Sequence, residues 1–258
     1  MTESDLSPEP CTETAADFRA RWDAVRARVD EAARAAGRDP AEVRLLPVSK
    51  TVPVERLRPA VDAGMAELAE NKPQEIGRKA VEMADLPVRW VAIGHLQTNK
   101  AKIVAEHAAE FQALDSVRLA EALQRRLEAL DETADGPADG PARTLDVLVQ
   151  VNTSGEDTKT GASPEEVDAI LEAAARCDRL RVRGFMTVAV HSEDEAEVRA
   201  CFAQLRGILE RARERAVVDP VLLTELSMGM SGDFPLAIAE GATCVRVGTA
   251  LFGARDYT

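Results

Sequence analysis

Hydrophobic positions follow two patterns that alternate along the whole chain. Short apolar runs rich in valine, leucine and isoleucine are typical of strands buried on both faces of a parallel sheet. Longer segments place apolar residues every three or four positions, and proline, serine, aspartate or glycine marks their ends, as in amphipathic helices. The pattern predicts eight strands, at residues 43–50, 65–69, 88–93, 111–114, 145–151, 182–186, 222–226 and 244–247.

A predicted helix separates each strand from the next. Six of these helices lie at residues 53–63, 73–83, 115–130, 163–176, 194–215 and 233–239, and one more follows the turn at residues 94–100 and runs through residue 107. Eight strands that alternate with helices predict an α/β protein with the architecture of a single (β/α)₈ TIM barrel. An extra helix at residues 17–36 precedes the first strand and is available to cover the bottom of the barrel.

The alternation continues unchanged beyond residues 131–142, a segment with two Gly-Pro steps and four acidic residues. We therefore interpret that segment as a flexible loop within one domain. The start of the chain is acidic and rich in proline, serine and threonine. This composition predicts a disordered tail at residues 1–15, followed by a barrel domain at residues 16–258.

The composition limits the partners that the chain can bind. A chain of 258 residues with 45% hydrophobic residues is long enough for one large core. The net charge of −13 and the 3% of aromatic residues argue against nucleic-acid binding by phosphate neutralisation and base stacking. An anionic ligand therefore has to be held by backbone donors and a few well-placed cations.

Cysteines and targeting signals indicate a cytoplasmic protein. Cys11, Cys177, Cys201 and Cys244 lie far apart with no Cys-x-x-Cys pair, which favours free thiols over disulfides or a zinc site. The first residues do not resemble a secretory signal, and no apolar run is long enough to span a bilayer. We therefore expect no membrane association.

Polar residues collect after the predicted strands. Lys50 ends the first strand, Asn71 follows the second, His95 the third and Asn152 the fifth. In an α/β barrel these positions meet at one mouth, where active sites lie. The amine of Lys50 is a candidate for Schiff-base formation there, and the alternative is a solvated lysine at a strand end.

The last two loops are the strongest candidates for anion binding. Residues 227–233 and 248–253 contain glycines together with serine or threonine hydroxyls, and a short helix follows the first of them. Glycines let backbone N–H groups approach an oxyanion, and in barrels this pair of loops is the usual phosphate site. Glycines with a purely conformational role are an equally good interpretation of either loop alone. The two loops together, facing Lys50 at the end of the first strand, favour an aldehyde ligand that carries a phosphate.

Three other signals are weaker. Arg246 can point into the mouth from the eighth strand, and an ion pair with one of the many carboxylates is an equally good interpretation. The three histidines are scattered and form no set of metal ligands, and we expect only His95 to line the mouth. Ser227 and Ser231 have no neighbouring His and Asp, which argues against a hydrolytic triad.

Five segments together resemble the pyridoxal 5′-phosphate (PLP) homeostasis proteins, a family of fold-type III PLP proteins related to the amino-terminal barrel of alanine racemase. The resemblance covers residues 17–257, nearly the whole chain. The matching segments are Val48-Ser49-Lys50-Thr51, Glu70-Asn71 with Gln74-Glu75, residues 93–100 (IGHLQTNK), residues 227–231 (SMGMS) with Asp233, and residues 245–255 (VRVGTALFGAR).

The resemblance implies seven cofactor-binding residues, no catalytic residue and no metal. It implies that Lys50 carries PLP as an internal aldimine and that Arg246 faces the pyridine nitrogen. It also implies a phosphate site and its surroundings, formed by Ser231, Gly248 and Thr249 with Met230 nearby, and a cofactor wall that includes Asn71. Where the family has Phe-Gly and a following aromatic residue around Glu-Asn, this chain has Leu68-Ala69 and Lys72, so we expect a differently shaped wall beside Asn71.

The expected function is reversible binding, storage and delivery of PLP in intracellular PLP homeostasis, without catalytic turnover. An arginine at the ring nitrogen only donates, so the ring stays neutral and is a poorer electron sink than a pyridinium. About ten residues follow the last predicted strand, too few for the second domain of the racemases and decarboxylases. The expected partners are PLP and PLP-dependent apoenzymes, and an acidic, complete barrel favours a monomer.

Two alternatives stay open on the sequence. A PLP-dependent amino-acid racemase or decarboxylase predicts turnover that disappears in the Lys50→Ala variant. A phosphosugar enzyme with Lys50 as an aldolase-like imine former predicts that borohydride traps a sugar phosphate on Lys50 and that the purified protein has no yellow chromophore.

Overall fold

The structure is a computed structural model that describes residues 13–133, 142–156 and 159–253. Of the predicted disordered tail at residues 1–15, residues 1–12 lie outside the described residues. Ala15 already belongs to the first helix. Most of the predicted flexible loop, residues 134–141, also lies outside them.

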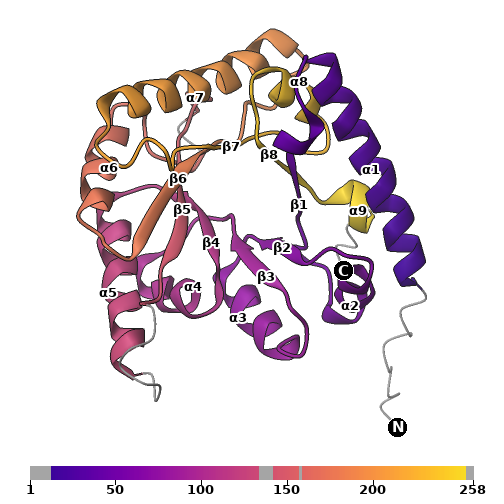
Figure 1. Cartoon of the computed structure of the whole chain (residues 1–258), viewed down its shortest axis with the longest axis horizontal. Helices are drawn as coiled ribbons and strands as arrows, with labels where there is room; N and C mark the ends of the chain where they lie inside the picture. Colours follow the sequence, from indigo (N-terminus) through magenta and orange to yellow (C-terminus); the bar gives the residue numbers. More distant parts are fainter. Residues whose placement is uncertain (1–12, 134–141, 157–158, 254–258) are drawn as a thin grey trace, which may run out of the picture.

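Eight parallel strands form the centre of the molecule and helices surround them (Figure 1). Hydrogen bonds connect the strands in the order β1-β8-β7-β6-β5-β4-β3-β2. The strands are β1 (Arg44–Pro47), β2 (Glu67–Glu70), β3 (Arg89–Ala92), β4 (Glu110–Leu114), β5 (Leu145–Gln150), β6 (Leu180–Met186), β7 (Glu225–Ser227) and β8 (Cys244–Val247).

The sheet closes between β1 and β2. A parallel bridge pairs Val48 with Ala69, and the amide of Ser49 donates to the carbonyl of Ala69 at 2.9 Å. This contact joins the two ends of the strand order, so the (β/α)₈ barrel predicted from the hydrophobic pattern is confirmed.

The α-helices are α1 (Ala15–Ala35), α2 (Val54–Asp62), α3 (Pro73–Glu82), α4 (Ala101–His107), α5 (Val117–Thr133), α6 (Val167–Ala175), α7 (Glu195–Arg215), α8 (Phe234–Ala239) and α9 (Thr249–Phe252). Two short 3₁₀ helices, η1 (Pro40–Glu42) and η2 (Thr98–Lys100), lie before β1 and α4. Neither η1 nor α9 was predicted. Strand β7 begins three residues later than predicted, because Leu222 and Leu223 form a turn through hydrogen bonds to Asp219 and Pro220.

Helix α1 lies on the outside of the barrel and not across its bottom. It begins with a capping box between Thr14 and Asp17, and it packs against α2, α8 and α9 (Figure 1). The helix thus covers the outer face beside β1 and β8, where the described residues after β8 form the short α9. The prediction that this helix covers the bottom of the barrel was wrong.

A ring of charged side chains closes the bottom of the barrel instead. Five strands begin with one of its members, Arg44, Glu67, Arg89, Glu110 and Glu225. Arg44 bridges Glu110 and Glu225 at 2.7 and 3.0 Å, and Arg89 bridges Glu67 and Glu110 at 2.5 and 3.0 Å. Because the charges alternate, the partly exposed guanidinium groups of Arg44 and Arg89 offset the charges of the carboxylates between them, of which Glu110 is the buried one.

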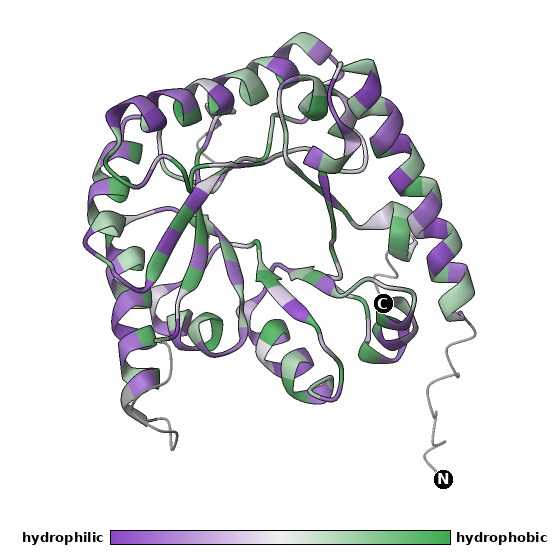
Figure 2. Ribbon diagram, viewed as in Figure 1, coloured by the Kyte–Doolittle hydropathy of each residue, from purple (hydrophilic) through white to green (hydrophobic). Residues whose placement is uncertain are grey.

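The apolar core has two parts. The large part lies between the sheet and the surrounding helices, which turn their hydrophobic stripes inward and their polar faces outward (Figure 2). A small second cluster of Leu46, Val48, Ala69, Val91 and Cys244 is separate from it. The opposite, carboxyl-terminal ends of the strands carry the cavity described next.

Candidate functional site

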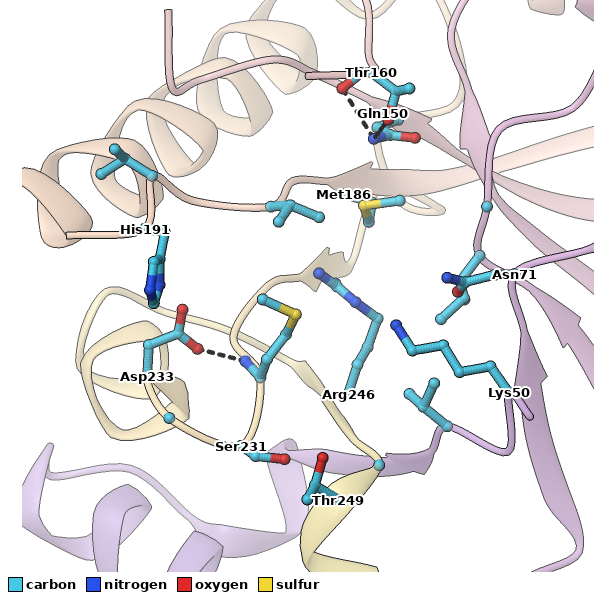
Figure 3. Close-up of a pocket in the computed structure, with 18 of the residues that line it drawn as sticks. Lys50, Asn71, Gln150, Thr160, Met186, His191, Ser231, Asp233, Arg246 and Thr249 are labelled. Carbon is cyan, nitrogen blue, oxygen red and sulfur yellow. Dashed lines mark hydrogen bonds between the residues drawn. The ribbon is translucent and has the colours of Figure 1, made fainter. Parts of the chain in front are cut away.

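A cavity of about 670 Å³ lies at the carboxyl ends of the strands. All seven site residues selected from the sequence line it (Figure 3), namely Lys50, Asn71, Met230, Ser231, Arg246, Gly248 and Thr249. They come from the ends of β1, β2, β7 and β8. The barrel therefore brings together residues that lie far apart along the chain, while their role toward a cofactor stays a prediction.

The backbone on both sides of Lys50 is fixed. Val48 donates to the carbonyl of Val247, and Ser49 donates to the carbonyl of Ala69, both at 2.9 Å. Thr51 has a φ of +68°, which a β-branched residue rarely adopts. These constraints direct the half-buried Lys50 side chain into the cavity, where its amine points toward the space around Arg246 (Figure 3).

A buried ion pair lies directly behind Lys50 and Asn71. Lys79 is fully buried and donates to the Glu70 carboxylate at 2.5 Å and to the carbonyl of Ser49 at 3.0 Å. The hydroxyl of Ser49 donates to the same carboxylate at 2.8 Å. Because Ser49 precedes Lys50 and Glu70 precedes Asn71, this cluster couples the backbones of β1 and β2 where the two site residues leave them. Sequence reasoning missed Lys79, which occupies an ordinary helix position.

Arg246 is only 4% exposed, and its hydrogen-bond partners are neutral. Its Nη1 donates to the hydroxyl of Ser227 at 2.8 Å, and its Nη2 donates to the carbonyl of Thr187 at 2.7 Å. Burial lowers the pKa of its guanidinium. Within the described part of the chain Arg246 forms no ion pair, so the ion-pair interpretation of this residue was wrong.

A chain of hydrogen bonds connects Arg246 to the bottom of the barrel. The hydroxyl of Ser227 donates to Gln112 Oε1 at 2.6 Å, and Gln112 Nε2 donates to Glu110 Oε1 at 2.6 Å. Ser227 and Gln112 are both fully buried. The orientation of Arg246 therefore depends on a polar network inside the barrel, which ends in the charged ring at Glu110.

The hydroxyls of Ser231 and Thr249 lie side by side at one edge of the cavity (Figure 3). Ser231 lies in the turn before α8, and Thr249 is the first residue of α9. The first two N–H groups of α9 have no partner within that helix, so α9 presents backbone donors here, whereas the Phe234 amide at the start of α8 donates to the carbonyl of Met230 at 2.9 Å and the following Pro235 has no N–H. The Asp233 carboxylate accepts from the amide of Met230 at 2.5 Å and thereby fixes the loop before α8. At Gly248 a Cβ would come within 3.1 Å of the carbonyl oxygen of Val48, so a larger residue would crowd this edge.

The wall beside Asn71 is built by close backbone packing. A Cβ at Gly94 would lie 2.1 Å from the carbonyl oxygen of Asn71, so only glycine fits there. Ala69 belongs to the small apolar cluster, whereas Lys72 is exposed at the start of α3. The exposed lysine leaves the outer part of this wall open to solvent.

The cavity has further lining residues that the sequence did not indicate. Gln150 donates to the hydroxyl of Thr160 at 3.0 Å, and His191 lines the same side (Figure 3). His95 lines the cavity as predicted and pairs with Asp115 at 3.0 Å. The prediction that His95 is the only histidine at the mouth was wrong, because the segment after β6 carries His191 back over it.

The described residues contain no group of three or more His, Cys, Asp and Glu side chains arranged to hold a metal ion. Cys177, Cys201 and Cys244 are buried free thiols, and Cys11 lies outside the described residues. Among the helices that the structure describes, none has the length and apolar character needed to cross a membrane.

Known proteins resemble this chain over nearly its whole length. Residues 21–256 match the family described as alanine racemase, N-terminal domain. A pyridoxal phosphate homeostasis protein of Pseudomonas aeruginosa is 45% identical over 234 residues, which cover 90% of this chain and 94% of that protein. The protein of the same name from Escherichia coli strain K12 is 39% identical over 243 residues, covering 91% of this chain and 95% of that protein.

Solved structures show the same relationship. PipY of Synechococcus elongatus PCC7942 with PLP bound is 35% identical, with a TM-score of 0.77. The match covers 92% of this chain and 100% of PipY. Alanine racemase of Streptomyces coelicolor A3(2) has a TM-score of 0.68 at 20% identity, covering 94% of this chain and 59% of the racemase, which shows a shared fold alone. The chain belongs to the alanine racemase N-terminal domain family and, within it, to the pyridoxal phosphate homeostasis proteins.

Proposed function

We propose that this chain binds PLP reversibly through Lys50 and acts in PLP homeostasis as a carrier that stores and delivers the cofactor. The observation that carries the proposal is the grouping of Lys50, Arg246 and the Ser231–Thr249 edge around one cavity. The name of the relatives from P. aeruginosa and E. coli and the PLP bound to PipY support the same ligand.

The donors around the cavity match the functional groups of PLP. The aldehyde of PLP condenses with a primary amine, and Lys50 brings one into the cavity. Arg246 is a buried donor suited to an aromatic ring nitrogen, and Thr187 and Ser227 hold it in place. The hydroxyls of Ser231 and Thr249, with the backbone N–H groups at the start of α9, suit the phosphate.

Arg246 favours binding over turnover. A guanidinium has no acceptor and keeps its proton in proteins, so the ring nitrogen facing it has to accept and stays unprotonated. A neutral ring is a poorer electron sink than a pyridinium. The hydrogen-bond chain through Ser227 and Gln112 maintains this orientation from inside the barrel. We therefore propose a carrier without catalytic turnover, which passes PLP to PLP-dependent apoenzymes.

The absorption spectrum tests the binding proposal. Protein mixed with PLP and freed of excess ligand should be yellow, and the Lys50→Ala variant should lose the chromophore. Lys102→Ala is a matched control, because Lys102 is an exposed lysine of α4 that does not line the cavity. Borohydride reduction followed by peptide mass analysis should place the cofactor on Lys50. A colourless wild type in excess PLP, or a label on another lysine, contradicts the proposal.

The carrier role is tested by two further assays. Transfer is measured by mixing the PLP-loaded protein with a PLP-dependent apoenzyme and following the recovery of that enzyme's activity, with free PLP removed. Turnover is measured with a panel of amino acids, and racemisation or decarboxylation that disappears in Lys50→Ala would favour an enzyme instead.

We also propose that the protein is a cytoplasmic monomer. The buried free thiols suit a reducing cytoplasm, and size-exclusion chromatography with light scattering should show a monomer.

A further inference from the structure

A second hollow, of about 390 Å³, lies between η2 and α5 and shares no lining residue with the cavity described above. Thr98 and Asn99 form its η2 side. Three arginines and one alanine of α5 form the other side, Arg118, Ala122, Arg125 and Arg126.

The spacing along α5 explains the shape of this hollow. Arg118, Ala122 and Arg125 follow one another at intervals of four and three residues, so they share one face of the helix. Ala122 is 8% exposed, and its small side chain leaves a depression between longer ones. The arginines therefore line the sides of a concave surface whose base is apolar and narrow.

These three arginines are an exception among the described residues of a chain whose net charge is −13. Within the described residues, Arg118, Arg125 and Arg126 form no ion pair or side-chain hydrogen bond, whereas Arg58, Arg78 and Arg199 on other helices each pair with a carboxylate. Glu121 precedes Arg125 by four residues, the arrangement that favours an ion pair on a helix, yet the pair does not form. Three neighbouring positive charges without partners repel one another, and a bound anion removes that repulsion.

We propose that the hollow between η2 and α5 binds a small anion that carries one or more phosphate groups. Guanidinium groups donate in pairs to phosphate oxygens, and the Thr98 hydroxyl and Asn99 amide add neutral donors opposite them. A compact anion interacts with the local arginines within the screening length of about 8 Å at physiological salt. An extended polyanion would also be repelled by a chain whose net charge is −13, which argues against nucleic acid.

This proposal does not rest on PLP binding by Lys50. The two sites use different residues, although both use the segment that follows β3: Gly94 and His95 line the large cavity, and Thr98 and Asn99 line the hollow. An anion that binds at the Ser231–Thr249 edge is unaffected by changes in α5. Comparing variants of α5 with wild type therefore isolates the hollow.

The test uses calorimetric titration of the full-length protein with inorganic pyrophosphate and with inorganic phosphate. The Arg118→Gln/Arg125→Gln/Arg126→Gln variant should bind pyrophosphate at least tenfold more weakly than wild type at this site. The matched control Arg34→Gln/Arg176→Gln/Arg211→Gln changes the net charge by the same amount at exposed arginines on other helices and should stay within twofold of wild type. Thermal unfolding confirms that both variants are folded.

Three outcomes overturn the proposal. The first is that wild type and the triple α5 variant bind pyrophosphate with the same affinity. The pyrophosphate would then bind in the large cavity at the strand ends and not in the hollow. The second is an equal loss in the control variant, which would reflect net charge and not the hollow. The third is a single-stranded oligonucleotide that binds the same arginines more tightly than pyrophosphate does.

Discussion

Arg246 Nη1 donates a hydrogen bond of 2.8 Å to the hydroxyl of Ser227, and both residues are buried inside the barrel. Ser227→Ala removes this acceptor and leaves Gln112 Oε1 without its donor. We expect a loss of about 1–3 kcal/mol in the free energy of unfolding, the typical cost of unsatisfied buried groups. We also expect weaker PLP binding and a shifted absorption maximum, because Arg246 is no longer held toward the ring.

The control for this prediction is Ser163→Ala, because the Ser163 hydroxyl forms no hydrogen bond within the described residues, and its amide, which donates to the Glu166 carboxylate at 2.8 Å, is kept in the variant. Denaturant unfolding and PLP titration are measured on both variants. A Ser227→Ala protein with wild-type PLP affinity and spectrum would limit Ser227 to a role in stability.

The ion pair between Lys79 and Glu70 should be important for stability, because neither side chain reaches solvent. Lys79→Met leaves the Glu70 carboxylate buried without its cation, and we expect a loss of about 3–5 kcal/mol in the free energy of unfolding. Lys102→Met is the comparison, since Lys102 pairs with Glu106 on the surface with 63% of its side chain exposed. Urea denaturation should show a much smaller loss for Lys102→Met, and equal losses would contradict the prediction.

Two glycines should respond in opposite ways to alanine. Gly184 in β6 has a φ of +152°, and a Cβ there would lie 1.9 Å from the carbonyl oxygen of Glu225 in β7. We expect Gly184→Ala to separate these strands and cost about 3 kcal/mol or more. Gly207 lies inside α7, where a Cβ meets only the end of the Arg211 side chain at 3.4 Å. Gly207→Ala should stabilise the protein by about 0.5–1 kcal/mol in thermal or urea unfolding. A Gly207→Ala protein that is less stable than wild type would contradict the prediction.

The Glu110 carboxylate should contribute to acid sensitivity. Burial raises the pKa of this group, but hydrogen bonds and charge from Arg44, with a further hydrogen bond from Gln112, hold the pKa below 4.5 overall. The unfolded chain therefore binds the proton first as pH falls below about 4.5, and the stability that Glu110 provides is lost as pH falls through its folded pKa.

The difference in unfolding free energy between wild type and Glu110→Gln measures this effect. We expect that difference to be largest near pH 6 and to narrow at pH 3.5, because a protonated Glu110 resembles glutamine. Glu121→Gln, a change at an exposed carboxylate of α5, should show no such narrowing. A wild-type to Glu110→Gln difference that is independent of pH would contradict the prediction.

Local sequence was sufficient for much of the site. Lys50, Ser231, Gly248 and Thr249 each follow a strand, and the geometry of parallel strands brings such positions to one end of a barrel. Apart from Arg246 in β8, residues inside strands and helices gave no comparable signal. Gln112 and Lys79 look like ordinary positions in β4 and α3. Only the folded structure shows that Gln112 accepts a hydrogen bond from Ser227 and that Lys79 pairs with Glu70.

The sequence by itself determined the eight strands and the helices that alternate with them, because hydrophobic periodicity reports which face of each segment is buried. It also determined which loops carry polar groups to the cavity. The tertiary structure alone decided that α1 lies outside the barrel, that a charged ring closes the bottom, and that Arg246 connects to that ring through Ser227 and Gln112. The physical reason is that side-chain partners in a closed barrel come from strands far apart in sequence, so burial and pairing are set only when the sheet closes.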